Sequence, residues 1–203
     1  SYFRELTRPP LSEYFRPNVW PNTPDILTEY LQHGGRPAFT ARLVLAATLS
    51  STYGVYGPAF ELCEAAPREP GSEEYLDSEK YQLRRWDLDR ADSLAPLMGH
   101  LNAIRRENPA LHDNRSLRFH AVDNEALIAY SKSSADGANL LVMVVNLDPH
   151  HRQSGWLDLP LEELGIDPTR PFLAEDLLTR ASYHWTGPRN YVELSPEGAM
   201  AHV

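Results

Sequence analysis

The sequence is poor in cysteine, in basic residues and in long apolar runs, and each shortage excludes a class of protein. Cys63 is the only cysteine among 203 residues, so the chain cannot form an internal disulfide scaffold. Lysine and arginine number 19 against 28 aspartates and glutamates, which argues against a nucleic-acid partner. No apolar run approaches the roughly 20 residues of a membrane span, and the first residues lack the apolar segment of a signal peptide. We therefore expect neither nucleic acid nor a membrane among the partners.

Helix signals dominate the chain up to about residue 113. Thr23 is placed to cap a helix that starts at Pro24, and Ala- and Leu-rich or periodically apolar stretches predict two further helices. The expected helices span residues 24–31, 38–49 and 93–107. Short strands are expected within 15–20 and 52–57, and a long polar segment covers 61–92. A polar segment of that length in a compact domain is usually functional or disordered.

The helix expected at residues 38–49 is apolar on nearly every side. Leu43, Leu45, Ala46 and Ala47 together leave no polar face, which is the pattern of a largely buried helix. We expect this helix to present an open apolar surface, on which further strands would pack.

Beyond residue 113 the apolar period changes from helical to strand-like. Short alternating runs separated by turn residues such as Asp123-Asn124 predict successive antiparallel strands. The strands are expected at residues 117–121, 126–131, 139–146, 154–159, 171–173, 183–185 and 190–194. Strands of this length and spacing favour an antiparallel β-sandwich.

Common catalytic signatures are missing from the sequence. It has no GxxxxGK[ST] or GxGxxG phosphate loop, no GxSxG nucleophile elbow and no HExxH zinc motif. We interpret Cys63 as a small apolar residue. His150 and His151 are expected in a surface turn, because adjacent residues of a strand point to opposite faces. No metal site is therefore predicted.

The loops of the first part combine aromatic rings with carboxylates and amides. Sugar sites use the same mixture, since flat rings cover the C–H faces of pyranoses while carboxylates and amides bind the hydroxyls. Local packing of the aromatic residues is the competing interpretation. Asp25 alone would also suit the first turn of a helix. The residues concerned are Trp20, Asn22, Asp25, Tyr53, Tyr56, Tyr75, Tyr81 and Trp86.

Four separate stretches resemble one enzyme family. The segment Phe15–Asp25 contains the sequence Trp-Pro-Asn-Thr-Pro-Asp. It resembles the segment that follows barrel strand 7 in enzymes of the α-amylase superfamily (glycoside hydrolase family 13). Within that superfamily, residues 71–82, 119–124 and 145–151 are similar to the maltosyltransferases. The resemblance covers essentially the whole chain, with the motifs in the same order.

The resemblance implies transfer of maltosyl units from α-maltose 1-phosphate to the non-reducing end of α-1,4-glucans, with retention. It implies that Asp25 is the third superfamily carboxylate, which stabilises the transition state, and that Lys80 and Tyr81 bind the donor. It further implies no metal or other cofactor, a cytoplasmic location and a homodimeric full-length protein. Other superfamily activities, such as trehalose synthase or α-glucan hydrolase, and a non-catalytic glucan-binding protein remain alternatives.

The chain departs from the family pattern in one large respect. The nucleophile and the acid/base of the superfamily follow strands 4 and 5, upstream of the strand-7 segment, which begins here at Phe15. A complete (β/α)₈ barrel needs about 250 residues. We therefore expect residues 1–113 to be the C-terminal portion of a TIM barrel (strands 7 and 8 with their helices) and residues 114–203 to be a β-sandwich domain. We expect such a piece of a longer protein to be inactive alone.

Overall fold

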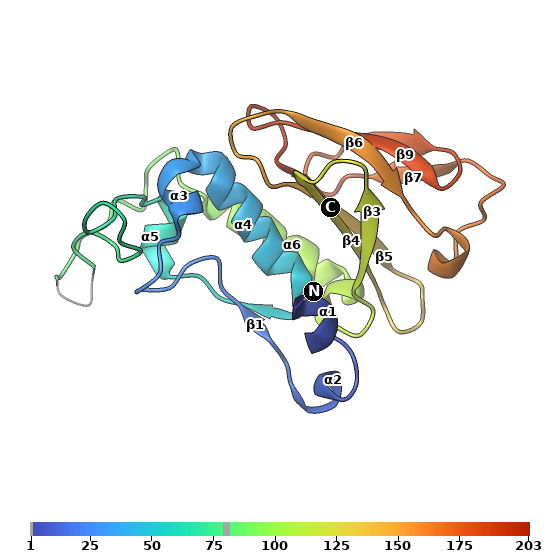
Figure 1. Cartoon of the computed structure of the whole chain (residues 1–203), viewed down its shortest axis with the longest axis horizontal. Helices are drawn as coiled ribbons and strands as arrows, with labels where there is room; N and C mark the ends of the chain where they lie inside the picture. The colour runs from blue at the N-terminus through green and yellow to red at the C-terminus, as the bar shows by residue number, and fades with distance from the viewer. Residues whose placement is uncertain (1, 79–81) are drawn as a thin grey trace.

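The computed structural model describes residues 2–78 and 82–203, and Figure 1 shows helices gathered beside a set of strands. Among the described residues, no helix is long and apolar enough to cross a membrane. The helices are α1 (Tyr2–Leu6), α2 (Leu11–Tyr14), α3 (Glu29–His33), α4 (Gly35–Leu49), α5 (Gly57–Glu61) and α6 (Ala95–Glu107), with the 3₁₀ turns η1 (Pro109–His112) and η2 (Glu162–Leu164).

Two short parallel strands flank α3 and α4 in the sequence. In β1 (Asn18–Val19) and β2 (Thr52–Tyr53), Asn18 pairs with Thr52 and Val19 pairs with Tyr53. The strand–helix–strand order is the usual connection between parallel strands. Because the strands are parallel, the loops that follow them leave from the same edge.

Helix α4 is the centre of the larger core. Its residues Ala38, Phe39, Leu43 and Val44 are fully buried. The Phe39 ring packs against Phe60 of α5, with centroids 5.1 Å apart. The expectation of an open apolar surface is therefore wrong: this chain itself covers the helix, because α6, β1, β2 and a strand of the large sheet all contact it.

The predicted start of the helix at residues 24–31 is also wrong. Thr23 and Ile26 exchange backbone hydrogen bonds of 3.3 and 3.2 Å, which closes a turn around Pro24 and Asp25. The backbone N–H of Leu27 donates to the carbonyl of Glu73 instead of entering a helix. Helix α3 begins only at Glu29, because the Thr23–Ile26 pair and the bond to Glu73 occupy the backbone groups that a longer helix would use.

The C-terminal part is a six-stranded antiparallel sheet with a separate hairpin. The sheet order is β10-β5-β4-β3-β6-β9, and β7 pairs with β8. The expected antiparallel β-rich region is confirmed, whereas β10 carried no recognisable signal. The strands are β3 (Arg118–Val122), β4 (Leu127–Ser133), β5 (Leu140–Asn146), β6 (Gln153–Asp158), β7 (Phe172–Glu175), β8 (Ser182–Trp185), β9 (Arg189–Leu194) and β10 (Ala201–His202).

The sheet has an apolar layer on each face. Tyr130 and Met143, which pair across β4 and β5, join the core around α4, and the Tyr130 hydroxyl lies 2.6 Å from Thr48 Oγ1 of that helix. The neighbouring pair, Ala129 and Val144, belongs to a second core. The second core also holds Leu157, Val192 and Leu194, with Phe172 and Trp185 of the hairpin packed against it. Successive side chains along β4 and β5 therefore point to opposite faces: one set packs against the helices and the other packs against the residues of the second core.

A lysine is buried where β4 meets the helices. Lys132 has no exposed surface, and its Nζ lies 3.4 Å from Asn114 Oδ1. Burial, followed by repulsion from Arg105, lowers the pKa of Lys132 to about 7. Burial of this amine destabilises the folded chain at every pH at which the unfolded chain keeps the lysine protonated.

We predict that Lys132→Met stabilises the chain at pH 7, and that the gain shrinks as the pH rises towards 10. The unfolded chain holds the Lys132 proton up to pH 10.5, whereas the folded chain releases it near pH 7, so wild-type stability rises between these values. The difference between wild-type and variant urea midpoints at several pH values measures the effect. A difference that does not change with pH would contradict it.

Candidate active site at the ends of the parallel strands

Asp25 lies on the exposed turn that follows β1. The turn leaves the carboxyl end of that strand and is closed by the Thr23–Ile26 backbone pair. Pro24 fixes one backbone angle within it. The turn therefore presents the Asp25 carboxylate on a short, restrained loop.

Asn22 joins the loops that follow β1 and β2. Its side chain is 2 % exposed; its Nδ2 donates to the Tyr75 hydroxyl at 2.7 Å and its Oδ1 accepts the Tyr56 backbone N–H at 2.9 Å. Burial raises the pKa of Tyr75 to about 12, so its hydroxyl keeps its proton at neutral pH. One amide thus holds both loops.

Gln32 of α3 makes a second connection between the same loops. Its Nε2 donates to the carbonyls of Leu27 and Ser72, each at 2.8 Å. Together with the bond from Leu27 to Glu73, this fastens the Asp25 turn to the long polar segment that follows β2.

Trp20 lies beside the start of the second loop. A Cβ on Gly54 would stand 2.6 Å from carbon atoms of the Trp20 ring, so only glycine lets the indole lie this close to the backbone. Trp20 remains 47 % exposed. A flat aromatic surface is therefore available on the loop that carries Asp25.

The structure brings several of the sequence-predicted site residues to one edge of the parallel pair. Asp25 and Trp20 are exposed there, while Asn22 and Tyr75 support the loops from inside. For these two the local-packing interpretation is the one the contacts favour. Lys80 and Tyr81 lie outside the described residues. A carboxylate and an indole on braced loops can bind hydroxyls and the apolar face of a sugar.

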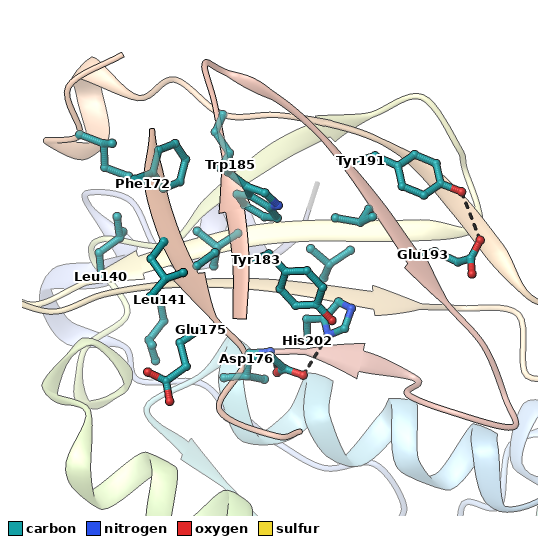
Figure 2. Close-up of a pocket in the computed structure, with 18 residues that line it drawn as sticks. Leu140, Leu141, Phe172, Glu175, Asp176, Tyr183, Trp185, Tyr191, Glu193 and His202 are labelled. Carbon is teal, nitrogen blue, oxygen red and sulfur yellow. Dashed lines mark hydrogen bonds and ion pairs between the residues drawn. The ribbon is translucent and has the colours of Figure 1, made fainter. Parts of the chain in front are cut away.

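A cavity of about 610 Å³ lies in the β-rich part, under the β7–β8 hairpin. Figure 2 shows Phe172 and Trp185 on one side of it and Asp176 with His202 on the other. His202 Nδ1 lies 3.0 Å from Asp176 Oδ2, and the Val203 N–H donates to Asp176 Oδ1. Burial raises the pKa of Asp176, but the bonds from His202 and Thr179 outweigh it, so the pKa lies below its ordinary value.

The cavity was not predicted from the sequence, because the five strands that line it, β5 and β7 to β10, come together only in the fold. The separation of Asp176 and His202 gave no motif, and their pairing follows from the place of β10 at the sheet edge. Asp176 ties the C-terminal residues to the hairpin, so its role is structural.

Solved structures identify the class of fold. The chain aligns with a noncanonic maltogenic α-amylase, AmyB, from Thermotoga neapolitana, with a TM-score of 0.60 and 13 % identity over 99 % of this chain and 44 % of that one. An Anoxybacillus α-amylase gives a TM-score of 0.59 and 14 % identity over 91 % and 37 % of the two chains. At such low identity the likeness shows the fold alone, which this chain shares with part of each of these α-amylase structures.

Comparison with sequence relatives narrows the class of protein that the chain resembles. Residues 119–203 match the family model described as GLGE, C-terminal. The whole chain is 50 % identical to an α-1,4-glucan:maltose-1-phosphate maltosyltransferase of Chlorobaculum tepidum and 53 % identical to maltosyltransferase 2 of Streptomyces coelicolor, covering 31 % and 30 % of them. The resemblance to the maltosyltransferases is confirmed over the full chain, which spans about a third of the length of these relatives.

We predict that Asn22→Ala destabilises the chain by about 1–3 kcal/mol, because it leaves the buried Tyr75 hydroxyl without its partner. Tyr75→Phe removes that hydroxyl and should cost less, since Asn22 keeps its bond to Tyr56. Urea unfolding of both variants and of the double variant measures the coupling. Additive effects of the two substitutions would show that Asn22 does not hold Tyr75.

Proposed function

We propose that the chain is a portion of a retaining maltosyltransferase, which moves maltosyl units from α-maltose 1-phosphate to the non-reducing end of α-1,4-glucans. The observation that carries the proposal is the 50 % identity to such an enzyme over the entire chain. The position of Asp25 supports it, because the carboxyl ends of parallel strands are where α/β barrels place their sites.

The finer architecture belongs to the same proposal. Residues 1–113 would supply strands 7 and 8 of a TIM barrel with their helices, and residues 114–203 a β-sandwich domain. The parallel pairing of β1 with β2 across α4 supports the first part. The two apolar layers of the antiparallel sheet support the second.

Asp25 would act on the transition state and not as the nucleophile. A retaining enzyme needs a carboxylate nucleophile and a second carboxyl group as acid/base, about 5 Å apart across the scissile bond. In the proposed enzyme, residues outside this chain provide both. A fixed anion on a braced turn would bind sugar hydroxyls and stabilise the positive charge that develops on the ring.

Donor binding and assembly complete the proposal. Lys80 and Tyr81 would hold the maltosyl group, since an ammonium and a phenol both donate to sugar hydroxyls. The enzyme would need no cofactor and would act as a homodimer in its full-length form.

We predict that the purified 203-residue chain releases no phosphate from α-maltose 1-phosphate in the presence of glucan, since the nucleophile and the acid/base are not in it. A coupled phosphate assay, with radiolabelled maltosyl transfer as a second readout, measures this. Detectable transfer by the chain alone would overturn the assignment.

In a longer polypeptide that joins this chain to the upstream barrel, Asp25→Asn should lower kcat by about 10²–10³-fold, because the amide lacks the charge that stabilises the transition state. Glu29→Gln, a nearby exposed acid at the start of α3, is the matched control and should leave kcat unchanged. Retained activity in a folded Asp25→Asn variant would remove Asp25 from the catalytic machinery.

A further inference from the structure

The cavity under the β7–β8 hairpin has no part in the proposed transfer reaction. Its volume of about 610 Å³ is that of a small-molecule site, whereas protein interiors rarely hold empty spaces larger than a water molecule. Among the described strands, β7 and β8 pair only with each other, so the cavity separates two layers of the β-rich part. Figure 1 places the hairpin at the opposite end of the molecule from α5. The cavity is therefore a candidate for a ligand of its own.

The walls of the cavity are mainly apolar and aromatic. Val142 and Val144 of β5 line it from the sheet, and both belong to the second core. Phe172 and Trp185 line it from the hairpin, with their rings edge to face and their centroids 6.1 Å apart. Leu173, which also lines the cavity, is 57 % exposed, so the space is open to solvent. Water finds few hydrogen-bond partners against such walls, and an apolar group can displace it.

The polar groups of the cavity are mainly carboxylates. Asp176, Glu175 and Glu193 line it, and no lysine or arginine is among the described residues that do so. The Asp176 carboxylate already accepts bonds from His202 and the Val203 N–H. It therefore belongs to the fold and has little capacity left for a ligand.

Glu175 and Glu193 are the carboxylates with capacity for a ligand. Each has one arginine partner outside the cavity, Arg180 at 3.8 Å and Arg152 at 3.3 Å. All four side chains are at least 45 % exposed, and exposed ion pairs of this kind are weak. A cation that enters the cavity can therefore compete for either carboxylate, while an anion meets no basic side chain on the walls except His202.

We propose that the cavity under the β7–β8 hairpin binds a small organic cation with an apolar body, of the kind of a primary ammonium on an aryl–alkyl chain. The apolar walls accept the body, and the faces of Trp185 and Tyr183 with the carboxylates of Glu175 and Glu193 attract the charge. A polyhydroxylated ligand would leave hydroxyls unpaired against the walls, which disfavours it. This proposal does not depend on maltosyl transfer.

Calorimetric titration of the 203-residue chain with phenylbutylammonium, phenylbutanol and phenylvalerate tests the proposal. The three probes share a phenylbutyl body and differ in the charge of the terminal group. Phenylbutylammonium should bind about tenfold more tightly than phenylbutanol, and phenylvalerate should bind most weakly. Because the cavity exists only in the folded chain, the cation should also raise the midpoint of thermal unfolding.

Two variants separate the body of the ligand from its charge. Ala174 alternates with the outward-facing Leu173 along β7 and lines the cavity, so Ala174→Phe should fill it and abolish binding of all three probes. Glu175→Gln combined with Glu193→Gln should weaken phenylbutylammonium about tenfold and leave phenylbutanol unchanged. Glu197→Gln, at an exposed acid that does not line the cavity, is the matched control and should change neither. Circular dichroism checks that each variant is folded.

A further readout needs no variant. Nuclear Overhauser effects from the phenyl ring of bound phenylbutylammonium should reach the methyl groups of Val142 and Val144. No binding by the wild-type chain, equal affinity for the cation and the anion, or contacts only with methyl groups outside the cavity would overturn the proposal. So would a dimer, seen by sedimentation, in which a second copy of the chain covers the cavity and excludes the probe.

Discussion

The structure depends on the burial of a helix that is apolar on nearly every side. Helix α4 must be covered over most of its surface, because leaving its leucine, valine and phenylalanine side chains in water would forfeit the main favourable contribution to folding. The chain meets this requirement with β1 and β2, α6, Phe60 of α5 and the inner face of the large sheet. The helical part and the β-rich part consequently share one core, and Tyr130 of β4 reaches Thr48 inside it.

The shared core fixes the position of the candidate site, although the core residues do not themselves line it. With α4 fixed, the parallel pair β1–β2 has a fixed carboxyl edge, and the loops that leave this edge are joined by Asn22 and Gln32. The turn that carries Asp25 is therefore held by neutral hydrogen bonds between backbone and amide groups.

Local sequence patterns predicted the helices and strands well where an apolar period continued over many residues. They predicted them poorly where contacts with distant residues determine the backbone conformation. Helix α4, helix α6 and strands β3 to β9 follow from periodicity. The start of α3 was wrong because Leu27 bonds to Glu73, 46 positions away, and no local propensity encodes that contact. The expectation of an open surface on α4 was wrong partly because β5, and Tyr130 of β4, also cover the helix, although the sequence had placed both strands in a separate unit.

The candidate site shows the same division. Residue types in loops singled out Asp25, Asn22 and the surrounding aromatic residues as candidates, and the role proposed for Asp25 is the one that the family resemblance implies. The partners of Asn22 required the fold, since Tyr75 lies 53 positions away.

In the proposed enzyme, Asp25 faces the sugar at the point of transfer. A crystal structure of the longer polypeptide with a maltosyl group trapped on its nucleophile tests this most directly. We expect an Asp25 carboxylate oxygen within hydrogen-bonding distance, about 2.5–3.0 Å, of hydroxyls on the attached glucose ring. An Asp25 side chain that points to solvent, with the ring held by other residues, would contradict it.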